Sequence, residues 1–203
     1  MIVYVETNFL LELAFQQESY ESCEEILRLA NSGSISIILP ACSVAEAYVG
    51  WHGINQRRRK FQEELQNHLR ELSRSASYRG VVDEYRNVTD ALVAGREESR
   101  NRLIAAITSI ETDGATIPVT ALMFAMVARD EEAHSLSPQD GLVLASVKSH
   151  ARKNDGPKCF VTKDKDFNKP AIREELGAEC EVLMNFDDAV GYIKNVLRGK
   201  AEP

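Results

Sequence analysis

Short apolar runs alternate with longer amphipathic segments along most of this chain, and this alternation limits the folds open to it. Strands are predicted at residues 2–5, 35–39, 159–162 and, more weakly, 181–184. Helical patterns separate the strands, so successive strands can run in the same direction. The sequence therefore predicts an α/β fold in three α/β/α layers, with a central parallel sheet of four to five strands.

The texture changes between residues 54 and 112, where apolar residues recur only at helical spacing. Breaks near residues 73–77 and at Gly95 divide this segment into two or three amphipathic helices. A chain of 203 residues fits one domain with an insertion. We therefore expect a single domain over residues 1–203, with residues 54–112 as a helical insertion.

The charge of the chain is unevenly distributed. Its net charge of −7 argues against general nucleic-acid binding. Residues 55–102, however, hold 11 basic and 8 acidic side chains. The densest basic run in this segment is Arg57, Arg58, Arg59 and Lys60. It is a candidate for contacts with RNA phosphates, and a solvated helical face is the alternative.

Several classes of protein lack support in the sequence. The four cysteines form no CxxC pair, the four histidines form no HExxH motif, and no GxGxxG, P-loop or GxSxG motif occurs. No apolar run approaches the roughly 20 residues that span a bilayer. The N-terminus is also a poor secretory signal, because no basic residue precedes its apolar stretch. We expect a cytoplasmic protein without membrane contact.

Four carboxylates follow predicted strands or fall in the first turn of predicted helices. They are Glu6, Glu46, Asp140 and Asp164, and Asp166 is a further acid nearby. Each has a structural alternative. Glu6 would end a strand, and Glu46 and Asp140 would complete helix caps with Ser43 and Ser137. Asp164 would be a turn residue.

Taken together, the acids point to a metal site. Ligands of open parallel sheets bind outside the carboxyl ends of the strands. Two carboxylates about 4 Å apart repel by roughly 4 kcal/mol at an effective dielectric constant near 20. A cluster would therefore require a cation or raised pKa values. Oxygen ligands of this kind suit a hard divalent ion such as Mg²⁺ or Mn²⁺.

The order of these motifs resembles that of the PIN-domain nuclease family, including its VapC-like ribonucleases. The similar segments are Val3-Tyr4-Val5-Glu6-Thr7-Asn8, Ser43-Val44-Ala45-Glu46, Asp140-Gly141-Leu142-Val143-Leu144-Ala145 and Val161-Thr162-Lys163-Asp164-Lys165-Asp166-Phe167. The resemblance implies that Glu6, Glu46, Asp140 and Asp164 hold Mg²⁺ or Mn²⁺, and that Asp166 is an additional catalytic acid. It also implies that Thr7, Asn8 and Thr162 orient water or phosphate.

The chain departs from the family pattern at two points. Glu6 stands where the family usually has aspartate, and the long helical segment between the second and third motifs is absent from small toxin-type members. The leading hypothesis is a metal-dependent endoribonuclease acting on RNA, with a toxin-type enzyme as its narrower form. The alternative is a catalytically silent module that binds RNA or protein. An antitoxin or other protein partner and a homodimer are expectations by family analogy.

Overall fold

The strands of this computed structural model, which describes residues 1–177 and 180–199, form one parallel sheet. The strands are β1 (Ile2–Val5), β2 (Ser36–Pro40), β3 (Ala115–Ile117), β4 (Lys158–Val161) and β5 (Glu181–Leu183). Their order is β3-β2-β1-β4-β5. In the register, Val3 lies beside Ile37 on one neighbouring strand and beside Cys159 on the other.

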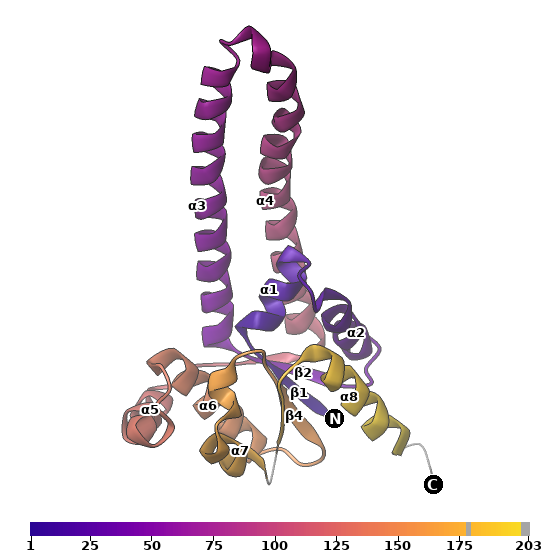
Figure 1. The fold of residues 1–203 in the computed structure, drawn as a ribbon. Helices are drawn as coiled ribbons and strands as arrows, with labels where there is room; N and C mark the ends of the chain where they lie inside the picture. The colour runs from indigo at the N-terminus through magenta and orange to yellow at the C-terminus, as the bar shows by residue number, and fades with distance from the viewer. Residues whose placement is uncertain (178–179, 200–203) are drawn as a thin grey trace.

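Helices cover both faces of the sheet, as predicted (Figure 1). One face packs against α1 (Thr7–Phe15), α2 (Tyr20–Asn31), the lower part of α4 (Arg79–Asp113) and α8 (Phe186–Gly199). The other face packs against α5 (Ala121–His134), α6 (Pro138–Ala151) and α7 (Pro170–Gly177). The predicted three-layer α/β/α architecture is therefore confirmed.

The alternation of side chains along β1 explains why the sheet has two cores. Val3 and Val5 point into the core formed with α1 and α2, whereas Tyr4 points into the core formed with α6 and α7. All three side chains are fully buried. Successive side chains of a strand face opposite sides, so a central strand of this sheet must be apolar throughout.

Two long helices form a hairpin that projects from the body of the molecule (Figure 1). They are α3 (Ala41–Leu72) and α4, joined through a short 3₁₀ helix, Ala76–Tyr78. The predicted break near residues 73–77 is confirmed. The predicted break at Gly95 is wrong, because α4 continues through it. A single glycine costs only about 1 kcal/mol relative to alanine, and packing along a long helix offsets that cost. None of the helices in residues 1–177 and 180–199 could cross a membrane.

Two local predictions also differ from the structure. Residues 115–117 form the edge strand β3, which the sequence analysis did not identify because it is only three residues long and Ala115 is exposed. The predicted helix cap at Ser43 is wrong, because α3 already begins at Ala41, directly after Pro40. The helix after β1 begins at Thr7, and its cap is Glu6.

Gly114 joins α4 to β3 where the chain passes very close to β2. A Cβ atom at this position would lie 2.2 Å from the carbonyl oxygen of Ile37 and 2.9 Å from that of Ile110. We therefore expect Gly114→Ala to lower the free energy of unfolding by about 1–3 kcal/mol, because backbone has to move. Gly95→Ala is the matched control and should raise it by about 0.5–1 kcal/mol, since nothing lies within 4 Å. Urea unfolding measures both, and equal effects of the two changes would contradict this account.

Candidate metal centre

The strand order reverses at β1 and β4. From β1 the chain adds β2 and β3 on one side, and later β4 and β5 on the other. Such a reversal of strand order is where open α/β sheets bind ligands. Glu6 directly follows β1, and Thr162 directly follows β4. The acids are predicted to gather at this edge of the sheet.

Asp140 lies in the first turn of α6. Ser137 caps this helix: its Oγ accepts a hydrogen bond from the Asp140 backbone N–H at 3.1 Å and donates one to Asp140 Oδ2 at 2.6 Å. Pro138 occupies the start of the helix, where a missing N–H costs nothing. The predicted cap is therefore present, and it holds the carboxylate at the edge of the sheet.

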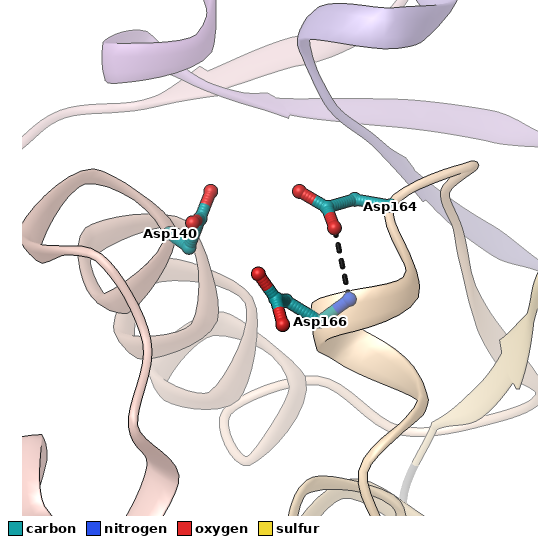
Figure 2. A group of neighbouring side chains, drawn as sticks. All are labelled: Asp140, Asp164 and Asp166. Carbon is teal, nitrogen blue, oxygen red and sulfur yellow. Dashed lines mark hydrogen bonds between the residues drawn. The ribbon is translucent and has the colours of Figure 1, made fainter.

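Asp164 and Asp166 come from the short 3₁₀ helix that follows β4, Lys165–Asn168. Asp164 caps it, accepting a hydrogen bond from the Asp166 backbone N–H at 2.8 Å on its Oδ1 (Figure 2). The backbone N–H of Asp164 donates a hydrogen bond to Thr162 Oγ1 at 2.9 Å. These local bonds turn both aspartates toward Asp140, as Figure 2 shows.

The three aspartates form a cluster of carboxylate oxygens. One oxygen from each of Asp140, Asp164 and Asp166 lies within 4.8 Å of the others. Asp140 and Asp164 are half-buried and Asp166 is exposed, so the cluster is open to solvent on one side. A donor set made entirely of carboxylate oxygens fits a hard divalent cation such as Mg²⁺ or Mn²⁺.

The surroundings of Asp140 favour its neutral form. Burial raises its pKa, and so do the nearby charges of Asp164 and Asp166, whereas the hydrogen bond from Ser137 and the charge of Lys169 act in the opposite direction. Lys169 Nζ lies 3.1 Å from Asp166 Oδ1 and donates to the Ser135 carbonyl at 2.9 Å. Sequence reasoning missed this lysine, although its position three residues after Asp166 was a usable signal.

Glu6 is the most strongly perturbed of the predicted site acids. Its side chain is 5 % exposed, and burial raises its pKa to about 7, even though Asn8 and Thr162 donate hydrogen bonds to it. Asn8 donates through its backbone N–H at 3.0 Å and through Nδ2 at 2.8 Å, and Thr162 Oγ1 donates at 3.0 Å. The charge of Glu46 raises the pKa further. Thr162 therefore forms hydrogen bonds with both Glu6 and Asp164.

Glu46 lies on α3 and is held by Thr7. The Thr7 hydroxyl donates a hydrogen bond to Glu46 Oε2 and lies 3.4 Å from the Ser43 carbonyl oxygen. The capping role considered for Glu46 is therefore not observed. The Ser43 hydroxyl is fully buried and is one of few buried side-chain atoms in the described residues without a hydrogen-bond partner.

The structure thus sorts the predicted site residues into two groups. Asp140, Asp164 and Asp166 meet the spacing of a metal site, whereas Glu6 and Glu46 are not part of that group within the described chain. The three residues expected to orient water or phosphate form hydrogen bonds with these acids. They are Thr7 for Glu46, Asn8 for Glu6, and Thr162 for Glu6 and Asp164.

The four residues of the basic run lie on different faces of α3. Arg58 sits over the ring of Phe15 at 4.8 Å, and Arg59 pairs with Glu63 at 2.9 Å. Arg57 and Lys60 follow Glu46 by 11 and 14 residues, which at 3.6 residues per turn returns them to the face of Glu46. Arg57 Nη1 lies 3.9 Å from where a Cβ of Gly53 would be, so this side chain extends back toward the sheet.

Comparisons with known proteins agree with the architecture. A family model described as a PIN domain matches residues 3–167, which include both the helical hairpin and the three clustered aspartates. Searches of curated proteins and of solved structures returned no match.

Proposed function

Because the chain belongs to the PIN-domain family, whose function is of the nuclease type, we propose that it is an endoribonuclease dependent on Mg²⁺ or Mn²⁺. The observation that supports this proposal most strongly is the cluster of Asp140, Asp164 and Asp166 at the strand switch point. Three carboxylates so close together repel one another, and a divalent cation would remove that repulsion.

Each residue of the site has a role in this proposal. Asp140, Asp164 and Asp166 hold the metal, and Glu6 and Glu46 complete the acidic edge. When bound, the metal supplies Lewis acidity and activates water for attack on a phosphodiester. Asn8, Thr7 and Thr162 keep the two glutamates in position through the hydrogen bonds described above.

We place the approach of RNA along the face of α3 that carries Glu46. Gly50 and Gly53 lie between Glu46 and the basic residues on this face, at spacings of 4 and 7 residues. Nothing but Arg57 lies within 4 Å of a Cβ at Gly53, so the helix surface is open there. Arg57 and Lys60, both exposed, would contact phosphates of the bound strand.

The proposal is tested by metal binding and cleavage together. We expect calorimetry to detect Mn²⁺ binding that disappears in Asp164→Asn, and we expect labelled single-stranded RNA to be cut with Mn²⁺ but not with EDTA. At a metal concentration 100 times Kd, the free energy of unfolding should rise by about 2.7 kcal/mol. RNA binding without metal binding or cleavage would instead favour the catalytically silent module.

A toxin-type enzyme is the narrower form of the proposal. Its test is growth arrest on expression of the intact chain, compared with expression of Asp164→Asn. Arrest by both forms would count against it, because the harm would then not depend on the acidic cluster.

A further inference from the structure

The seam between α3 and α4 is polar in its middle, although its two ends are packed. Near the sheet, the buried Trp51 donates from Nε1 to Ser99 Oγ at 3.0 Å. Near the tip, Leu69 and Val82 are buried. Between these points Asn55, an amide, faces the space between the helices. Apolar residues normally fill such a seam, so a polar stretch there calls for another explanation.

A cavity occupies this polar stretch. Its volume is about 290 Å³, and a smaller neighbouring cavity has a volume of about 100 Å³. Asn55, Arg59 and Arg96 line both cavities, so the two form one groove between the helices. The larger volume approaches that of known small-ligand sites, which begin near roughly 300 Å³.

The side chain of Asn55 lines this groove and carries an unsatisfied hydrogen-bond acceptor. The residue is 5 % exposed, and its Nδ2 donates to the Trp51 carbonyl at 2.9 Å. That bond fixes the amide, because the opposite orientation would place two acceptors against each other. Its Oδ1 is buried and has no partner among the described residues. An unsatisfied buried acceptor costs about 1–3 kcal/mol, so a ligand with an N–H or O–H donor would be favoured once the side chains that cover this oxygen move aside.

The charged side chains of the groove favour an anion beside that donor. Arg58, Arg59 and Arg96 line the larger cavity, and the acid that lines it is Glu63. Glu63 already pairs with Arg59, but both side chains are more than half exposed. A surface pair of this kind is worth little, so an incoming phosphate can compete for the guanidinium.

We propose that this groove binds one nucleotide of the RNA substrate. Its phosphate would contact Arg59 and Arg96, and an amine of its base would donate to Asn55 Oδ1. This inference rests on the proposed ribonuclease function. Asn55 lies nine residues beyond Glu46 on α3, or about 14 Å along the helix. Nine residues are about two and a half turns, so Asn55 lies on the face of α3 opposite Glu46, and a strand bound along the Glu46 face would cross α3 to reach the groove.

The experiment uses Trp51, the single tryptophan of the chain, as a reporter beside the groove. The probe is a single-stranded RNA of 12 nucleotides, titrated in EDTA so that it is not cut. Binding should change the Trp51 fluorescence. In Arg59→Gln/Arg96→Gln the dissociation constant should rise about tenfold or more, because charged hydrogen bonds are lost. The slope of log K against log salt should also fall by about 0.7, because one phosphate contact is lost.

A second variant separates binding from folding. Asn55→Leu removes the buried acceptor, so we expect RNA to bind about tenfold more weakly while the melting temperature stays the same or rises. A purely structural asparagine would not give opposite changes in these two measurements. Unchanged RNA affinity in Asn55→Leu and in the double arginine variant would overturn the inference.

The matched control is Arg152→Gln/Lys153→Gln, which removes two exposed charges from the opposite end of α6 to Asp140. It should keep the dissociation constant within about twofold. An equal loss of affinity in the control would also overturn the inference, because the effect would then be one of net charge. RNA cleavage by wild type with Mn²⁺ tests the proposed function separately, whatever the groove binds.

Discussion

Asp140→Asn should lower the rate of RNA cleavage about 10³-fold, because losing several kcal/mol of transition-state stabilisation costs about tenfold per 1.4 kcal/mol. The fold should survive this change. The amide that replaces the carboxylate still offers an oxygen to Ser137, which donates to Asp140 Oδ2 in the wild type. The repulsion among the three aspartates also falls, so the metal-free variant should be as stable as wild type or more stable. Single-turnover cleavage with Mn²⁺ and thermal unfolding in EDTA measure the two effects.

The control for this prediction is Asp155→Asn. Asp155 is an exposed aspartate after α6, so the variant loses the same charge away from the cluster. Its cleavage rate should stay within about twofold of wild type. Equal cleavage by Asp140→Asn and wild type would exclude the aspartate cluster as the catalytic centre.

The second large effect is a dependence of the free energy of unfolding on pH, caused by Glu6. Its pKa is about 7 in the folded metal-free protein because of burial, against 4.5 for the free side chain. Between pH 4.5 and 7 the unfolded state releases this proton before the folded state does. The stability that Glu6 contributes is therefore fully present below pH 4.5 and is lost as the pH rises to 7. The loss amounts to about 3 kcal/mol, at 1.36 kcal/mol per pKa unit.

Comparing wild type with Glu6→Gln isolates the contribution of Glu6 to this pH dependence. Glutamine does not titrate, so the difference in unfolding free energy between the two proteins should shift by about 3 kcal/mol across this range in EDTA. Urea unfolding at pH 4.5, 6 and 8 gives the values. With excess Mn²⁺ the wild type should lose less stability, because a nearby cation favours the ionised carboxylate. Parallel pH profiles of the two proteins in EDTA would show that Glu6 is already ionised in the folded state.

The candidate site was only partly predictable. Asp140 and its Ser137 cap could be read from four consecutive residues, since helix caps depend on local chain geometry. Which acids join the metal-site cluster could not be predicted from the local sequence. Asp166 joins Asp140 and Asp164 because a 3₁₀ turn aims it there, whereas the carboxylate of Glu6 accepts hydrogen bonds from Asn8 and Thr162 and is not in that group. The division of the basic run follows from helix rotation and from where Phe15 lies.

By itself, the sequence determined the α/β class, four of the five strands, the helical character of residues 54–112 and the stretches that supply the acids. These features depend on burial patterns with periods of two and 3.6 residues, which are local properties of the chain. Only the tertiary structure decided which acids share one point, which lysine faces them and that a polar groove opens between α3 and α4. Those outcomes depend on contacts between residues far apart in the chain, and such contacts form only when the elements pack.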